Sequence, residues 1–285
     1  MSSFAGSQIP QLSIRNDHVT EPLRVRAIML DWAGTTVDHG SVAPVAALQT
    51  LFAQHGISLS IEDARRDMGL LKRDHIRAIL GLPGVRAKWA AETGREPIEA
   101  DVQSLFEEFG PLQMEIIAQH STLIPGVVET VKEWQSRGWR IGSSTGYTRS
   151  MLEPVQAQAA LEGYRPDASV CPDEVGAGRP APWMLMKNAQ LLGVYPPSTC
   201  VKIGDTVIDV VEGKNAGMWT IGLTKTGNLV GVNQKQWEQL PEASKKERLK
   251  DAESALIKAG ADYVAEDLAS CNEALAEIEE RLNHK

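Results

Sequence analysis

The sequence predicts an α/β fold, namely a doubly wound, Rossmann-like parallel sheet that carries an inserted all-helical cap domain. Three observations predict it. Short, continuous apolar runs of strand length recur along the chain, helical patterns separate most of them, and one gap between two runs is far longer than a crossover helix needs. Strands buried on both faces have this continuous apolar character, and their alternation with helices is typical of a parallel sheet.

Five segments have the length and composition of buried strands. They are VRAIMLD (25–31), WRIGSST (139–145), TCVKIGD (199–205), MWTIGL (218–223) and ADYVAED (261–267). Helical patterns such as GVVETVKEWQSRG and DVVEGKNAG lie between them. We therefore expect βαβ units with helices on both faces of the sheet.

More than 100 residues without a convincing strand pattern separate the first two predicted strands. Their periodicity is helical, and Ser60 and Asp63 are placed like a capping pair. A connection of this length greatly exceeds an ordinary crossover, so we interpret it as an inserted domain. The predicted organisation is an N-terminal arm over 1–24, a core domain formed by 25–41 and 121–285, and a helical cap domain over 42–120.

Composition and charge argue against several classes of protein. The formal net charge is −8, and neither sign forms long blocks, so we expect no nucleic-acid partner. No apolar run approaches the roughly 20 residues that a membrane helix needs. The first 24 residues lack the pattern of a secretory signal, so we expect a cytoplasmic protein. Cys171, Cys200 and Cys271 are widely spaced without a C-x-x-C pair, which predicts reduced, structural cysteines.

Polar residues follow the predicted strands at the sheet edge where α/β proteins bind ligands. Asp31 ends the first strand, and we expect the amides of the Trp32 to Thr35 turn after it to face a phosphate. The other candidates are Ser144, Thr145 and Gly146 after the second strand, Arg179 in AGRPAPWM, and Asp205 and Asp209 in GDTVIDV. Phosphoryl transfer needs such parts: an in-line nucleophile, carboxylates that hold a hard cation, and fixed positive charge.

Each fragment is weak evidence alone, since an aspartate at a strand end is more often a helix cap or a turn residue. Their order is much more specific. It resembles the four motifs of the haloacid dehalogenase superfamily, matched here by Asp31 with Gly34 and Thr35, by Thr145, by Arg179, and by Asp205 with Asp209. The resemblance implies that Asp31 forms a phosphoaspartate, and that Mg²⁺ is bound by Asp31, the Ala33 carbonyl and Asp205, with Asp209 in support.

Arg179 replaces the lysine that is common in the third motif of that superfamily. The arginine keeps the positive charge and adds a planar fork of donors. We expect this fork to hold phosphate oxygens in a bidentate manner.

Ala33 occupies the position where phosphatases and mutases of the superfamily place an acidic aspartate. Alanine can neither protonate a departing alkoxide nor activate water. The chain is then either a protein that binds a phosphate compound without turnover, or an enzyme whose leaving group departs as carbon. A carbon leaving group requires an electron sink, and a lysine that condenses with a neighbouring carbonyl supplies one as a protonated imine.

The segment DMGLLKRDHIRAIL (67–80) offers a candidate lysine within the predicted cap. On a helix, Met68 and His75 would share one face with Lys72. Alone, these residues would be read as core filler, a packing histidine and a solvated charge.

Five motifs together change this interpretation. DWAGTTVD, MGLLKRDH, STGYTR, AGRPAPWM and VKIGDTVIDV, in this order, resemble the phosphonatases, the family that hydrolyses the C–P bond of phosphonoacetaldehyde during phosphonate degradation. The resemblance covers most of the chain after about residue 25. One departure is Ser41, where some members have cysteine.

The family resemblance implies specific roles. Lys72 would form a Schiff base with the substrate, and Mg²⁺ would be the cofactor. A small phosphonate would be the substrate, and the protein would be a homodimer. The implied substrate-binding residues are Met68, His75, Thr145, Gly146, Tyr147 and Arg179.

Three alternatives stay open at this point. A phosphatase or phosphomutase acting on P–O bonds fits the motifs, but Ala33 disfavours it and Lys72 would have no role. A dehalogenase would not need Asp205 for a metal. A phosphate-binding protein on the same fold is the non-enzymatic alternative.

Overall fold

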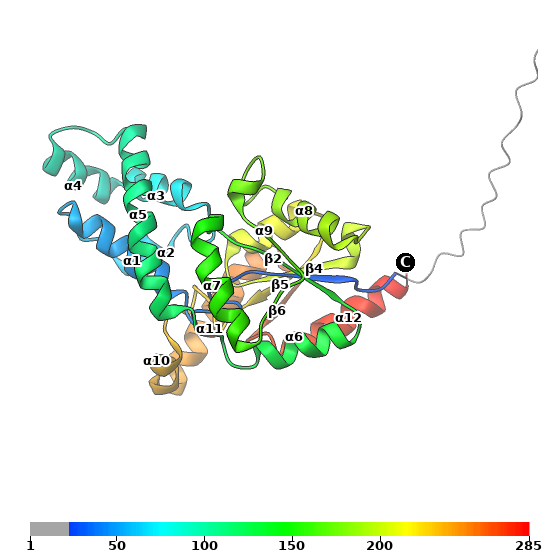
Figure 1. The fold of residues 1–285 in the computed structure, drawn as a ribbon. Helices are drawn as coiled ribbons and strands as arrows, with labels where there is room; N and C mark the ends of the chain where they lie inside the picture. Colours follow the sequence, from blue (N-terminus) through cyan, green and yellow to red (C-terminus); the bar gives the residue numbers. More distant parts are fainter. Residues whose placement is uncertain (1–22, 285) are drawn as a thin grey trace, which may run out of the picture.

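The computed structural model, which describes residues 23–284, contains one six-stranded sheet in which every neighbouring pair of strands is parallel (Figure 1). The strands are β1 (Ala27–Leu30), β2 (Arg140–Ser144), β3 (Ala168–Val170), β4 (Cys200–Gly204), β5 (Trp219–Leu223) and β6 (Tyr263–Ala265). Their order is β3-β2-β1-β4-β5-β6, which confirms the predicted doubly wound sheet. All of the predicted N-terminal arm except its last two residues lies outside the described residues.

The centre of the sheet positions the functional side chains. The strand order reverses between β1 and β4, and ligands of doubly wound sheets bind at such a switch point, beyond the carboxyl ends of the strands. Leu30 is in register with Ser143 on one side and Ile203 on the other. The residues that follow, Asp31 and Ser144 among them, therefore reach the edge of the sheet at the same level.

Helices cover both faces of the sheet, as the alternating pattern predicts. Figure 1 shows α8 and α9 on one side and α6 and α12 on the other. Outside the predicted cap, the helices are α6 (Val127–Ser136), which directly precedes β2, and those after β2, namely α7 (Arg149–Glu162), α8 (Trp183–Leu192), α9 (Val207–Asn215), α10 (Gln234–Gln239), α11 (Glu242–Lys258) and α12 (Cys271–Asn283). All three cysteines are buried and free, as predicted. Within residues 23–284 no helix is both long and apolar enough to cross a membrane.

Of the six helices between β1 and β2, five lie where the sequence predicts the inserted cap. They are α1 (Val42–Gln54), α2 (Ile61–Arg65), α3 (Lys72–Gly81), α4 (Pro83–Thr93) and α5 (Glu99–His120). Helix α5 packs against α1 and α3, and it also contacts α7 of the core. The Ser60 hydroxyl accepts a hydrogen bond from the Asp63 amide at 3.0 Å, which confirms the predicted capping pair. The boundary residues of the cap domain stay a prediction.

Two expectations about local structure need correction. We expected a single helix to hold Met68, Lys72 and His75. This prediction is wrong for Met68, because α2 ends at Arg65 and α3 begins only at Lys72. Gly69, with φ of 98°, turns the chain between them. Strand β3 was not predicted, because its sequence ASV contains a single bulky apolar residue and shows no apolar run.

Candidate active site

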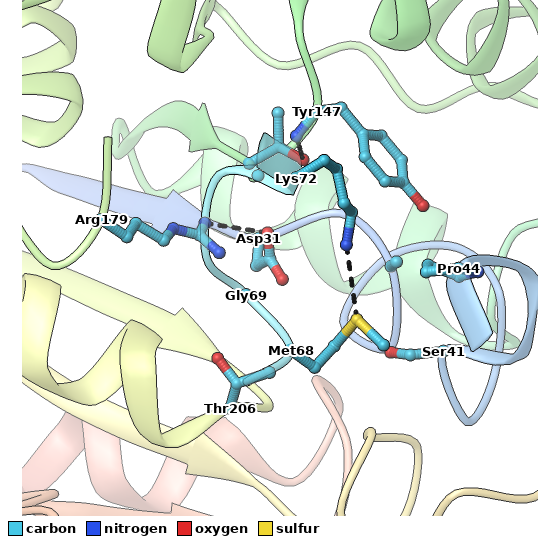
Figure 2. Close-up of a pocket in the computed structure, with 12 residues that line it drawn as sticks. Asp31, Ser41, Pro44, Met68, Gly69, Lys72, Tyr147, Arg179 and Thr206 are labelled. Atoms are coloured by element: carbon cyan, nitrogen blue, oxygen red, sulfur yellow. Dashed lines mark hydrogen bonds and ion pairs between the residues drawn. The ribbon is translucent and has the colours of Figure 1, made fainter. Parts of the chain in front are cut away.

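The carboxyl ends of β1, β2 and β4 border a small pocket, and the segment 68–72 lies against it (Figure 2). The pocket is narrow and partly open to solvent, and the space at its mouth and interior together is about 300 Å³ when the adjoining solvent is counted. Eight of the predicted site residues line it: Asp31, Ala33, Met68, Lys72, Thr145, Gly146, Tyr147 and Arg179. Ser41, Pro44, Gly69 and Thr206 complete the lining. The structure thus brings together Asp31 and Arg179, which are 148 positions apart in the sequence.

Asp31 follows β1 and is buried at the base of the pocket. One of its carboxylate oxygens, Oδ1, accepts a hydrogen bond from Arg179 Nη2 at 2.9 Å. Burial raises the pKa of Asp31, and the charge of Arg179 only partly opposes this effect. Beneath it, Trp32 Nε1 donates to Ser143 Oγ at 3.0 Å, which fixes the turn against β2.

The turn after Asp31 differs from the expectation that its amides face a ligand. The Gly34 amide donates to the Val37 carbonyl at 2.7 Å, and the Thr35 amide donates to the Trp32 carbonyl at 3.1 Å. The prediction is therefore wrong for these two groups, because they close the turn itself.

Arg179 is almost fully buried, and each nitrogen of its guanidinium faces a carboxylate. Nη2 contacts Asp31, Nε donates to Glu212 Oε2 at 2.9 Å, and Nη1 lies 3.0 Å from Asp209 Oδ1. Nη2 also donates to the Ser144 carbonyl at 2.8 Å. The three nitrogens of this planar fork therefore already contact three acidic side chains. A bidentate contact between Arg179 and phosphate stays a prediction.

Lys202 and Glu212 belong to this cluster, and the sequence reasoning missed both. Lys202 Nζ lies 2.8 Å from Asp209 Oδ1 and 3.2 Å from Ser144 Oγ. The Ser144 hydroxyl donates to Glu212 Oε2 at 3.0 Å. A signal was present, because TCVKIGD places a lysine inside an otherwise apolar, doubly buried strand, where a charge requires a partner.

Three buried carboxylates, Asp31, Asp205 and Asp209, offer oxygens that all lie within 4.8 Å of one another. Burial, together with the neighbouring carboxylates Asp31 and Asp209, raises the pKa of Asp205. Burial alone would also raise the pKa of Asp209, but Arg179 and Lys202 outweigh it and lower that pKa. The negative charge of Asp31 and Asp205 is therefore incompletely balanced, and a divalent cation fits this set of hard oxygen donors.

Asp205 is held by groups from two segments, the loop between β1 and α1 and the loop after β5. It accepts from the Thr35 hydroxyl at 3.1 Å, from the Ser41 hydroxyl at 3.3 Å and from the Asn228 amide at 2.7 Å. Ser41, the departure from the family pattern, thus contacts a predicted metal ligand. Asp209, in contrast, caps α9 through Thr206, whose hydroxyl donates to Asp209 Oδ2 at 2.6 Å.

Lys72 is the first residue of α3, and only 2% of its surface is exposed. Its Nζ lies 3.5 Å from the Met68 sulfur and 5.8 Å from the centre of the Tyr147 ring. Burial, with a smaller contribution from the positive charge of Arg179, lowers the pKa of Lys72 to about 8, although Asp31 opposes the shift. Figure 2 shows this amine on the pocket side of α3, across the pocket from Arg179. Near neutral pH part of the population therefore carries a nucleophilic amine.

His75 and Tyr147 are placed differently from each other. His75 is fully buried on α3 and is not among the residues that line the pocket. Burial and the charge of Lys72 lower its pKa to about 3, although the nearby Ala64 backbone opposes the shift, so the imidazole is neutral. Tyr147 does line the pocket, and burial raises the pKa of its phenol, which keeps it protonated. A proton-transfer role for His75 stays a prediction.

Two glycines allow the segment 68–72 to lie close to the strand ends. A Cβ atom on Gly146 would lie 2.6 Å from the Leu70 carbonyl oxygen, which is a severe clash with backbone. A Cβ atom on Gly69 would lie 2.6 Å from Thr206 Oγ1. Only residues without a Cβ fit at both positions, and this is what seats Lys72 over the pocket.

Known proteins resemble the chain over nearly its whole length. The family model for haloacid dehalogenase-like hydrolases matches residues 25–217. A phosphonoacetaldehyde hydrolase of Nitratidesulfovibrio vulgaris is 45% identical over 258 residues, which is 90% of this chain and 92% of the relative. One of Syntrophobacter fumaroxidans is 44% identical over 273 residues, or 96% of this chain and 98% of the relative.

A solved structure agrees with these sequence relatives. The crystal structure of a phosphonoacetaldehyde hydrolase-like protein from Oleispira antarctica has a TM-score of 0.90 to this chain and is 38% identical to it. The match covers 93% of this chain and 95% of that one.

Replacing Lys72 with methionine should stabilise the protein at pH 7. The unfolded chain, with an ordinary lysine pKa of 10.5, binds more protons than the folded chain between pH 8 and 10.5. The buried ammonium therefore costs stability fully below pH 8, and this cost disappears as the pH rises through that window. We expect Lys72→Met to raise the free energy of unfolding by about 2 kcal/mol at pH 7, and by much less at pH 10.5. Urea unfolding at both pH values measures the difference, and an unstabilised variant at pH 7 would contradict the desolvation of Lys72.

Proposed function

The chain belongs to the haloacid dehalogenase-like hydrolases and, within them, to the phosphonoacetaldehyde hydrolases, and on this premise we propose that it hydrolyses the C–P bond of phosphonoacetaldehyde to acetaldehyde and inorganic phosphate. The observation that carries the proposal is the buried amine of Lys72, which lines the same pocket as Asp31. Ala33 in place of an acid fits a leaving group that departs as carbon.

Lys72 prepares the substrate for cleavage. Its neutral amine attacks the aldehyde carbon, and loss of water leaves a protonated imine that retains the phosphonate group. This imine accepts the electron pair of the C–P bond, so the leaving group becomes an enamine rather than a carbanion. The low pKa of Lys72, caused mainly by burial, supports this role because an ordinary lysine is almost entirely protonated at neutral pH.

Asp31 is the proposed nucleophile toward phosphorus. Its carboxylate attacks in line with the C–P bond, which forms a phosphoaspartate and releases the enamine on Lys72. Protonation of the enamine at carbon and hydrolysis of the resulting imine release acetaldehyde and restore Lys72. A second water molecule hydrolyses the phosphoaspartate to inorganic phosphate and restores Asp31.

The pocket also supports the charge changes on phosphorus. Arg179 supplies fixed positive charge beside Asp31, and Thr145 and Gly146 line the adjacent wall. Asp31, the Ala33 carbonyl and Asp205 would hold Mg²⁺, which supplies further positive charge to the phosphoryl oxygens. Asp209 would support this site without binding the metal, because its carboxylate already contacts Thr206, Arg179 and Lys202.

The competing functions account for fewer of these features. A phosphatase or phosphomutase would leave the buried amine of Lys72 without a chemical role and would lack an acid at residue 33. A protein that only binds phosphate would not benefit from burying an amine whose ammonium form costs stability. The homodimer implied by the family resemblance and the cytoplasmic location expected from the N-terminal sequence both stay predictions, and sedimentation velocity would test the former.

Borohydride trapping tests the imine directly. With phosphonoacetaldehyde present, reduction should attach an ethylphosphonate or ethyl group to Lys72, identifiable by peptide mass spectrometry, and the loss of activity should parallel the adduct. Lys72→Arg, which keeps the positive charge, should give no adduct at that position. Asp31→Asn should retain the adduct but release no phosphate. An adduct at another lysine of the active wild-type protein would exclude Lys72 as the amine.

The pH dependence of trapping should follow the low pKa of Lys72. Below pH 8 the neutral fraction of the amine rises about tenfold per pH unit, and above pH 8 it levels off. We therefore expect the initial rate of adduct formation to rise up to about pH 8 and then become constant. A rate that continues to rise toward pH 10 would indicate an ordinary, solvated lysine.

A further inference from the structure

Arg65 connects the inserted helices to two segments of the core, although it lies outside the pocket. It is the last residue of α2. Its Nη1 donates to the Gly40 carbonyl at 2.7 Å and to Asn228 Oδ1 at 2.9 Å, and its Nη2 donates to the Gly231 carbonyl at 3.0 Å. The Asn228 side-chain amide donates back to the Arg65 carbonyl at 3.3 Å.

The loop that receives Arg65, residues 226–231 after β5, also contacts the predicted metal site. The Asn228 amide donates to Asp205 Oδ2 at 2.7 Å, and the Thr226 hydroxyl donates to the Gly34 carbonyl at 2.8 Å. A Cβ atom on Gly227 would lie 2.5 Å from the Cβ of Asp205, so this loop packs directly against that residue. One loop therefore has Arg65 on one side and Asp205 on the other.

The acceptors around Arg65 make its contacts sensitive to geometry. They are a side-chain amide and backbone carbonyls from two separate segments, so these hydrogen bonds form together only when α2 lies against both segments. The planar guanidinium reaches acceptors in several directions at once, which a single ammonium group cannot reproduce. Gly231 allows the close approach, since a Cβ there would lie 2.9 Å from Arg65 Nε.

The position of Arg65 in the chain links it to Lys72. Only Arg66, Asp67 and the turn at Met68 to Leu71 separate it from α3. Anchoring Arg65 to the core thus fixes the start of the segment that holds the amine over the pocket, while the same contact holds Asn228 in place for Asp205.

We propose that Arg65 is a positioning residue, which couples the seating of Lys72 over the pocket to the placement of Asp205 at the metal site. The proposal rests on the proposed function for its trapping assay, but not for its metal-binding assay. Without the Arg65 contacts, the segment 68–72 moves away from the pocket more often, and the Asn228 loop holds Asp205 less firmly. Arg65 touches neither substrate nor metal, so both effects are indirect.

The variant Arg65→Lys tests the coupling, and Arg66→Lys is its matched control. Arg66 is the next residue, is half exposed and pairs only with Asp63 among its ion pairs within residues 23–284. Two quantities are measured for each: the rate of borohydride trapping at Lys72 with phosphonoacetaldehyde, and the affinity for MgCl₂ by isothermal titration calorimetry without substrate. We expect Arg65→Lys to lower both by about tenfold, and Arg66→Lys to leave both within about twofold of wild type.

A second variant covers the case in which Arg65→Lys does not fold. Asn228→Ala removes the Oδ1 acceptor of Arg65 but keeps the backbone amide that donates to Asp205, and it should reduce the trapping rate and the Mg²⁺ affinity in the same direction. If both variants fold, the double variant should have a trapping rate and a Mg²⁺ affinity no lower than those of the more impaired single variant. The reason is that the two residues act through one contact. Wild-type values of both quantities in Arg65→Lys, or in Asn228→Ala if only that variant folds, would overturn the proposal. Absence of trapping in the wild type would instead refute the proposed function, and the Mg²⁺ titrations would still decide the role of Arg65.

Discussion

The site depends on the close packing of the segment 68–72 against the carboxyl ends of the central strands. Because Gly69 lies against Thr206 and Gly146 lies against Leu70, the first turn of α3 is pressed onto the pocket and Lys72 loses its water. A solvated lysine would keep its charge and remain a poor nucleophile. Burial therefore converts an ordinary residue of an inserted helix into a reactive amine, at a cost in stability that the rest of the fold must offset.

The second requirement is a buried charge cluster in which each member restrains another. Arg179 and Lys202 are shared among Asp31, Asp209 and Glu212, with Ser144 between them. Buried ion pairs contribute little net stability, because desolvation cancels most of their attraction. Their value here is orientation, since the guanidinium that meets Asp31 is fixed from its other nitrogens. Asp209 remains ionised under two cations, whereas burial raises the pKa of Asp31 and Asp205, and a metal ion would stabilise the ionised form of both carboxylates.

Much of this arrangement could be predicted from the sequence, and the exceptions have physical reasons. Asp31, Thr145 and Asp205 were predictable to meet because parallel strands deliver their carboxyl ends to one edge. The prediction that Met68 and Lys72 share a helical face was wrong, because Gly69 breaks the helix. Tertiary folding still brings the Met68 sulfur to the Lys72 amine. Glu212 and the loop around Asn228 were missed because no periodic pattern marks a loop or a single buried acid.

The most direct test of the central claim is the stoichiometry of the products from phosphonoacetaldehyde. Acetaldehyde, measured by coupled reduction, and inorganic phosphate should appear in equal amounts, and a chelator should stop both until Mg²⁺ is restored. Phosphate monoesters should release no comparable amount of phosphate, since Ala33 provides no acid for an oxygen leaving group. Efficient hydrolysis of such esters with no acetaldehyde from the phosphonate would contradict the account and identify the chain as a P–O phosphatase.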